Sequence, residues 1–214
     1  MLKMMQAGGA AALFLAAAAV PASAAAATAP PSDQVTVDVV TVNGSGCPKG
    51  TASVTELPDN TSFTVTYSDY LASAGGGSAP TDFRKNCQLS LLVHVPQGFT
   101  YAIARADYRG YAYLQSGATG EERANYYFQG DSQTTPSSHV INGPYNDDWD
   151  FSDTADAGAL VYAPCGESRG FNINTELRVR AGASNPANST NLMTMDDTRG
   201  SVNTVYHFSW KHCS

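Results

Sequence analysis

The feature that most constrains the fold of this chain is a two-residue period in its larger apolar side chains. Apolar and polar residues alternate along Phe63–Tyr67, Cys87–Val95, Ile173–Val179 and Val202–Trp210. Neighbouring side chains of an extended strand point to opposite faces, so each run can bury one face of a β-strand and expose the other. After the N-terminal leader, no segment shows a convincing 3.6-residue period longer than two turns, and only residues 121–128 fit either a helix or a strand.

Turn-forming residues separate these runs at short intervals. Asn43–Gly46, Leu57–Asn60, Ala74–Ser78 and Pro96–Gly98 are rich in Gly, Pro and Asn, which favour turns over continued strands. Charged residues make up 14% of the chain, below the roughly 25% of typical soluble domains, and Ser, Thr, Asn and Gly supply the polar surface instead. We therefore predict an all-β fold, a two-layer antiparallel, jelly-roll-like β-sandwich of about eight to eleven short strands.

The first 24 residues have the pattern of a signal peptide. Lys3 is followed by an apolar run from Ala10 to Val20, and Ala22-Ser23-Ala24 provides the small residues that signal peptidase accepts. The apolar run is shorter than the roughly 18–20 residues that span a bilayer. We predict a secreted, extracellular protein with no membrane span, in which a flexible tether over residues 25–33 precedes a single domain over residues 34–214.

Four cysteines follow the leader, at Cys47, Cys87, Cys165 and Cys213. An even number of cysteines in an exported chain predicts two disulfides, for which three pairings are possible. We favour Cys47–Cys87 and Cys165–Cys213, which join neighbours in the sequence, and the other two pairings stay open. The four residues are too dispersed for the paired spacing of a zinc site, so we expect two disulfides that cross-link the β-sandwich.

The charge of the chain argues against two classes of partner. Without Lys3 the chain carries 11 Lys and Arg against 19 Asp and Glu, a net charge of −8. An acidic surface repels phosphate backbones and anionic lipids. We therefore expect no binding to nucleic acid or to membrane surfaces. We also expect the protein to be a monomer.

Several short motifs suggest a family. In chain order they are Gly46-Cys47-Pro48, Arg84-Lys85-Asn86-Cys87, Pro96-x-Gly98, Asp107-Tyr108-Arg109-Gly110-Tyr111, Gly143-Pro144 with Asp147-Asp148, and Pro164-Cys165-Gly166. Together with the four cysteines, this ordered set resembles the family catalogued as domain of unknown function 4360, small secreted proteins of bacteria and fungi. The resemblance extends over about residues 35–213. It implies a secreted, β-rich domain and supplies no activity, substrate or catalytic residue.

Aromatic residues are dense between positions 101 and 128. Tyr101, Ile103 and Arg105 alternate with alanines, which predicts a strand that carries these three side chains on one face. Farther along, Tyr108, Arg109 and Tyr111, with Asp147 and Asp148 nearby, form a candidate ligand surface: aromatic rings can stack on sugar rings while carboxylates accept hydrogen bonds from sugar hydroxyls. The alternative is that the tyrosines are core or cross-strand residues, and that Arg109 forms a half-buried ion pair with Asp107 and with Asp147 or Asp148.

The most acidic segment is Tyr145–Asp153, with Asp156 just beyond it. Several carboxylate and amide oxygens on one loop could bind Ca²⁺. Counted from Asp148, the segment departs from an EF-hand, because Asp153 stands where the turn needs Gly and Ala159 where a bidentate Glu belongs. The alternative is a solvated loop in which Asp and Asn form turns. We therefore predict no cofactor, with Ca²⁺ at this loop as the exception to test.

Enzyme motifs are absent from the sequence. It contains no G-x-S-x-G, H-E-x-x-H or Walker A pattern, so we assign no catalytic residue. Carboxylate pairs for glycoside hydrolysis could be drawn from Glu56, Glu121, Glu122, Glu167 and Glu176. Our leading hypothesis is a non-enzymatic extracellular binding or structural module for polysaccharide or cell-envelope material. A protein-interaction or inhibitor domain that uses the loops Ala74–Ser78 or Thr134–Ser138 comes second, and a hydrolase third.

Overall fold

The fold was analysed in a computed structural model, which describes residues 28–132, 136–185, 187, 189–195 and 204–213. Every regular element in these ranges is a β-strand. The strands are β1 (Thr36–Asn43), β2 (Ala52–Glu56), β3 (Ser62–Tyr67), β4 (Leu71–Gly75), β5 (Arg84–His94), β6 (Phe99–Leu114), β7 (Thr119–Phe128), β8 (Ser137–Asn142), β9 (Tyr145–Thr154), β10 (Gly170–Arg180), β11 (Thr190–Thr194) and β12 (Thr204–His212). None of the described residues forms a helix that is long and apolar enough to cross a membrane.

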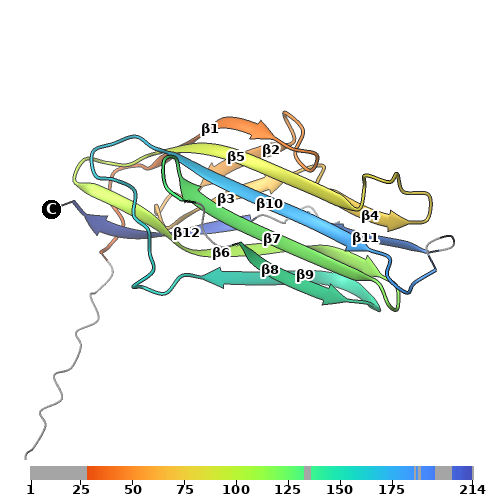
Figure 1. The fold of residues 1–214 in the computed structure, drawn as a ribbon. Coiled ribbons are helices and arrows are strands. Elements are labelled where there is room, and N and C mark those ends of the chain that lie inside the picture. The colour runs from red at the N-terminus through yellow and green to blue at the C-terminus, as the bar shows by residue number, and fades with distance from the viewer. Residues whose placement is uncertain (1–27, 133–135, 186, 188, 196–203, 214) are drawn as a thin grey trace, which may run out of the picture.

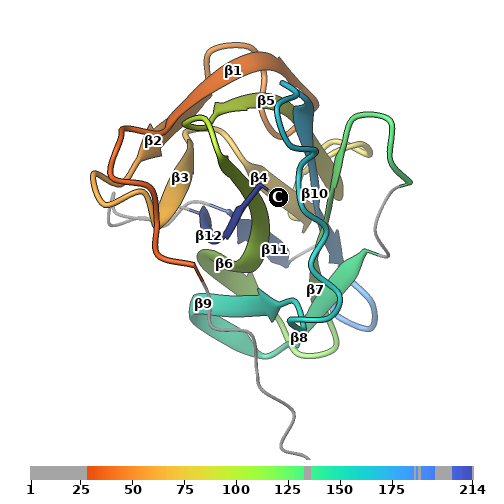
Figure 2. The same cartoon turned by 90° about the vertical axis from the view of Figure 1, so that its left-hand side faces the viewer.

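The strands form two antiparallel sheets (Figures 1 and 2). One sheet has the order β1-β5-β10-β7-β8, and the other runs β2-β3-β12-β6-β11-β4, with β9 paired to the remaining edge of β6. The predicted two-layer antiparallel sandwich is confirmed. Its twelve labelled strands exceed the eight to eleven expected, and residues 121–128, which also fitted a helix, belong to β7.

The core lies between the sheets, where the alternating side chains predicted it. In β5 the buried residues are Cys87, Leu89, Leu91 and Val93, whereas His94 is exposed. The inner faces of β3, β10 and β12 are formed in the same way, by Phe63, Val65, Tyr67, Phe171, Ile173, Leu177, Val179, Tyr206 and Trp210. The two-residue period therefore placed the core correctly in these strands, none of which contains an inserted residue.

Strand β6 departs from a simple alternation because it contains a β-bulge. His207 of β12 pairs with Arg105 and the next residue, Phe208, pairs with Ile103, so Ala104 is an extra residue on β6. Before the bulge Ile103 is buried, and after it the buried positions are even-numbered, beginning with Ala106. The prediction that Arg105 shares the face of Ile103 is wrong, because one inserted residue inverts the phase of a strand.

Both disulfides follow the predicted pairing. Cys47, in the turn after β1, is bonded to Cys87 of β5 with 5.3 Å between the Cα atoms. Cys165, in the connection after β9, is bonded to Cys213 with a Cα separation of 5.8 Å. The first bridge fastens the turn after β1 to the five-stranded sheet, and the second fastens the β9–β10 connection to the end of β12.

The N-terminal segment Thr28–Asp33 lies against the domain. Thr28 forms an isolated β-bridge with Trp210, and the Nδ2 of Asn60 donates hydrogen bonds to the carbonyl oxygens of Pro31 at 2.9 Å and of Asp33 at 2.8 Å. In residues 28–33 the predicted tether therefore contacts the domain, because Asn60 binds the backbone of Pro31 and Asp33. Residues 25–27 and the predicted signal peptide over residues 1–24 lie outside the described residues.

Candidate functional site

A pocket of about 540 Å³ opens between the two sheets beside the start of β8. The described part of β8 pairs with β7 only from Thr119 to Ala124, so the last residues of β7 extend past their neighbour. On the opposite sheet the chain leaves β9 after Thr154, and the backbone N–H of Ala155 donates a hydrogen bond to the carbonyl of the bulged Ala104 at 2.9 Å. This anchor directs residues 155–161 along the opening of the pocket.

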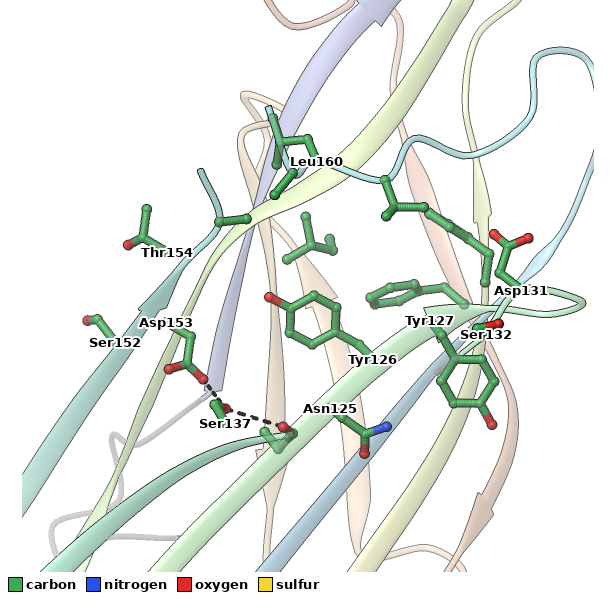
Figure 3. A pocket seen from close by; sticks show the side chains of 17 residues that line it. Asn125, Tyr126, Tyr127, Asp131, Ser132, Ser137, Ser152, Asp153, Thr154 and Leu160 are labelled. Atoms are coloured by element: carbon green, nitrogen blue, oxygen red, sulfur yellow. Dashed lines mark hydrogen bonds between the residues drawn. The ribbon is translucent and has the colours of Figure 1, made fainter. Parts of the chain in front are cut away.

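Aromatic rings form the inner wall of the pocket (Figure 3). The rings of Phe128 and Phe171 lie 5.4 Å apart between centroids, and those of Tyr126 and Phe171 lie 5.9 Å apart. Leu160 and Val161, from the connection after β9, add aliphatic surface. Burial, and then the nearby carboxylate of Asp153, raise the pKa of Tyr126, so its hydroxyl keeps its proton at neutral pH.

One side of the pocket carries a hydrogen-bonded cluster around Asp153. The Ser137 hydroxyl donates to Oδ2 of Asp153, and Nε2 of His139 lies 2.9 Å from Oδ1. The His139 ring stacks on Phe151 with 4.5 Å between centroids. Serine, histidine and aspartate meet here, but the Ser137 hydroxyl and the His139 imidazole both contact the Asp153 carboxylate. A nucleophilic triad needs the serine hydroxyl on the imidazole, so this cluster is not arranged as a triad.

The opposite rim is formed by Asp131 and Ser132. Asp131 lies 3.6 Å from the guanidinium of Arg169, with about 40% of its side chain exposed. Tyr127 is drawn with its ring directed away from the Tyr126 ring in Figure 3. The pocket therefore has a carboxylate on each side of an aromatic wall.

A buried carboxyl group lies in the core near Asp153. Glu122 is 0% exposed, and neither of its carboxyl oxygens has a hydrogen-bond partner among the described residues. Burial raises its pKa well above the ordinary value, and the charges of Asp153 and Glu121 add to this effect. The buried hydroxyls of Tyr108 and Tyr206 also have no partner in the described structure.

The sequence did contain a signal for the position of Glu122. It shares the phase of Ala124 and Phe128, both of which are buried on the inner face of β7. Sequence analysis named Glu122 only as one of several carboxylates, because charged residues are normally placed on an outer face.

The structure separates the residues of the candidate ligand surface. Arg109 and Tyr111 pair with Asp150 and Asp148 of β9, so Arg109, Tyr111 and Asp148 share the outer face. Asp147 pairs with the inward-facing Ala112 and lies on the other side of the sheet. Tyr108 is 0% exposed, so its placement on a ligand surface is wrong: the bulge at Ala104 turns it into the core.

The expected ion pair of Arg109 is wrong as well. Asp107 instead accepts hydrogen bonds from Nε of Arg105 at 2.6 Å and from the Ser152 hydroxyl at 2.5 Å, and it contacts Nε2 of His207 at 2.8 Å. Burial acts to raise the pKa of Asp107, but these hydrogen bonds outweigh it and the pKa is lowered. In the described structure Arg109 is exposed and forms no ion pair, whereas the Tyr111 hydroxyl donates to Asn146 at 2.5 Å.

The family is decided by a match over most of the chain. Residues 33–213 match the family model described as "Domain of unknown function (DUF4360)". The chain belongs to this family. A relative in Arthroderma benhamiae, named "Uncharacterized secreted protein", is 35% identical over 185 residues, which cover 86% of this chain and 74% of the relative. The protein is secreted, in agreement with the sequence prediction.

A comparison with solved structures adds no argument about function. The enzymatically active domain of bacteriophage CBA120 tailspike protein 4 is 12% identical to this DUF4360 protein, with a TM-score of 0.27. The alignment covers 84% of this chain but 19% of the tailspike chain. The function of this DUF4360 domain must therefore be argued from its own residues.

The acidic segment expected as a calcium-binding loop is strand β9 in this DUF4360 domain. Its carboxylates alternate between two faces instead of converging, and the described residues contain no group of three or more His, Cys, Asp or Glu side chains that could hold a metal ion. The loop prediction is therefore wrong, because Asp147–Asp150 pair with β6 along its length.

The other candidate features lie away from the pocket. Its lining includes none of the glutamates considered for hydrolysis, namely Glu56, Glu121, Glu122, Glu167 and Glu176. Ala74–Ser78 is the end of β4 and a tight turn closed by a hydrogen bond from Ser78 N–H to the Gly75 carbonyl. In Thr134–Ser138, Ser137 and Ser138 begin β8, and residues 134 and 135 lie outside the described residues.

Proposed function

We propose that this secreted protein is a non-enzymatic binding module that takes a carbohydrate of polysaccharide or cell-envelope origin in the pocket between its sheets. The observation that carries the proposal is the pocket itself. Its volume of about 540 Å³ lies within the range of roughly 300–1,000 Å³ typical of ligand sites, and apolar walls with a few polar groups are the usual composition of such sites.

The lining suits a sugar ring. A pyranose presents C–H groups on its faces and hydroxyls around its edge. The Tyr126 and Phe128 rings offer an apolar surface to the face, and Asp131, Ser132 and Asp153 provide acceptors and donors at the sides. A ligand of this kind would replace water at both the aromatic and the polar parts of the pocket.

The same residues favour binding over catalysis. The Ser137 hydroxyl is bonded to Asp153 and not to His139, and the nearby Glu122 is fully buried. A glycosidase needs two carboxyl groups that both reach the glycosidic bond. Asp153 and Glu122 do not meet this requirement, because of these two only Asp153 lines the pocket. The other carboxylate of the pocket, Asp131, lies on the opposite rim, where it is 3.6 Å from the guanidinium of Arg169.

The experiment is retention on insoluble chitin, cellulose and bacterial or fungal cell wall, compared with a carrier protein. Ala159 is exposed and lines the pocket, so Ala159→Trp should fill the opening and abolish retention. Tyr111→Ala removes a ring from the outer face of β6 and should leave retention unchanged. Loss of retention in Tyr111→Ala with full retention in Ala159→Trp would contradict the pocket, and retention no better than the carrier would contradict the function.

A further inference from the structure

The pocket has one sign of charge. Among the described residues, the lining contains the carboxylates of Asp131 and Asp153 and no Lys, Arg or His side chain, although the Arg169 guanidinium lies 3.6 Å from Asp131. Outside the leader the chain carries a net charge of −8, which adds a repulsive field for anions and an attractive one for cations. Sugars with carboxylate, sulfate or phosphate groups are therefore disfavoured in this pocket.

Asp153 differs from three other partly buried carboxylates of the domain. Asp107 pairs with Arg105, Glu121 with Arg180, and Glu176 with Arg84. Asp153 forms no ion pair with a Lys or Arg among the described residues. Its contacts are the Ser137 hydroxyl and the His139 imidazole, and its side chain is 19% exposed.

The Asp153 carboxylate also has unused hydrogen-bonding capacity. A carboxylate has about four acceptor sites, and Ser137 and His139 occupy two of them. Its negative charge acts on the core around it, because it contributes to the raised pKa of both Tyr126 and Glu122, after the larger effect of burial. A cationic group of a ligand beside Asp153 would meet this charge where water is partly excluded.

The aromatic wall favours the same type of ligand. Tyr126 lines the pocket on the side of Asp153 (Figure 3), and Phe128 also belongs to the lining. The face of an aromatic ring attracts ammonium groups. A carboxylate beside an aromatic face can bind an amine with a charge-assisted hydrogen bond and a cation–π contact together.

We propose that the natural ligand is an oligosaccharide whose units carry free amino groups, with one ammonium group bound by Asp153 against the aromatic wall. This inference rests on the proposed function and specifies the sugar. The N-acetylated sugar has the same ring but no positive charge, so it should bind the pocket more weakly.

The test is calorimetric titration with three tetrasaccharides, built from glucosamine, N-acetylglucosamine and glucose. We expect the glucosamine tetramer to bind about tenfold more tightly than the acetylated one, and its affinity to fall as salt is raised while the neutral sugars change little. This salt dependence tests the inference without any variant.

Variants of strand β9 provide the second arm of the test. Asp153→Asn should reduce the preference for glucosamine to less than about threefold, whereas Asp150→Asn, a control on the exposed outer face, should keep it. Melting curves of both variants check that they fold.

The outcomes separate this inference from the proposed function. Equal or tighter binding of the acetylated tetramer, lost in Ala159→Trp, would overturn the inference and leave the carbohydrate pocket standing. Binding of tetralysine as tightly as the glucosamine tetramer would also overturn it, because charge alone would then explain the affinity. No binding of any of the sugars would overturn the proposed function itself.

Discussion

The two faces of strand β7 differ in how many groups compensate a charged side chain. On the outer face, Glu121 accepts a hydrogen bond from Ser138 at 2.8 Å and lies 3.3 Å from both Arg123 and Arg180. On the inner face its neighbour, Glu122, is fully buried and has no hydrogen-bond partner in the described structure. The two glutamates are adjacent in sequence, yet one is compensated by several groups and the other by none.

This difference teaches what each face contributes. Partial burial acts to raise the pKa of Glu121, but Ser138 and the arginines outweigh it and the pKa is lowered. Burial raises the pKa of Glu122 with nothing to oppose it. The outer face stabilises charged side chains that contact water. On the inner face, burial of the Glu122 carboxyl group lowers the free energy of unfolding unless the group keeps its proton.

The largest expected effect concerns the apolar side chains of the inner face. Leu177 of β10 pairs with Glu122 and is 0% exposed, so Leu177→Ala should lower the free energy of unfolding by about 2–5 kcal/mol through lost burial and a cavity. Arg178, the next residue, lies on the outer face, and Arg178→Ala should cost less than about 1 kcal/mol. Equal losses in denaturant unfolding would remove the distinction between the faces.

A smaller effect, which depends on pH, tests the charge of the inner face. The folded state keeps the Glu122 proton to higher pH than the unfolded chain does, because the ordinary pKa of this glutamate is 4.5. The stability that protonated Glu122 contributes is therefore fully present below this ordinary pKa. The free energy of unfolding then falls by about 1.4 kcal/mol per pH unit as the pH rises toward the folded-state pKa. Glu122→Gln should remove this loss, so it should be more stable than the parent at pH 7 and similar to it at pH 4.

Glu121→Gln is the matched control on the outer face. The folded-state pKa of Glu121 is lowered, so its contribution is present above the ordinary pKa and lost as pH falls. The two variants should therefore change the pH dependence of unfolding in opposite directions. Parallel pH profiles for Glu121→Gln and Glu122→Gln would show that Glu122 is not the uncompensated group described above.

The smallest effect is expected from an ion pair of the outer face. Arg180 is 55% exposed at its side chain and lies 3.3 Å from Glu121. A double-mutant cycle with Glu121→Gln and Arg180→Ala should give a coupling of about 0.2–1 kcal/mol, and raising the salt concentration to about 1 M should reduce it. A coupling above about 2 kcal/mol would mean that the outer face is less solvated than its exposure indicates.

Sequence reasoning predicted the parts of the fold in which the alternation is continuous. Leu89 and Leu91 of β5 and Ile173 of β10 are buried as expected, because neither β5 nor β10 contains an inserted residue there. The prediction for Tyr108 failed because a bulge depends on how two strands pair, and the sequence of one strand does not show it.

The pocket could not be predicted from local patterns. Its lining joins the end of β7, the end of β9 and the following connection, so that Tyr126, Asp153 and Leu160 meet only after the sheets have packed. Glu122 was within reach of the sequence, since its phase matches that of Phe128. A strand over residues 121–128 would have placed it inside, but that segment also fitted a helix, and the general preference of charge for water argued against that position.

The bulge at Ala104 also affects how this domain can vary in length. Without that residue, β6 would keep the same side chains in the core, because Ile103 and Ala106 would then alternate regularly across Arg105. What a deletion removes is the carbonyl that receives the Ala155 N–H, the anchor for the lip of the cavity. Deletion of Ala104 would thus leave the packing of the core unchanged but free the segment after β9 that lines the opening of the pocket.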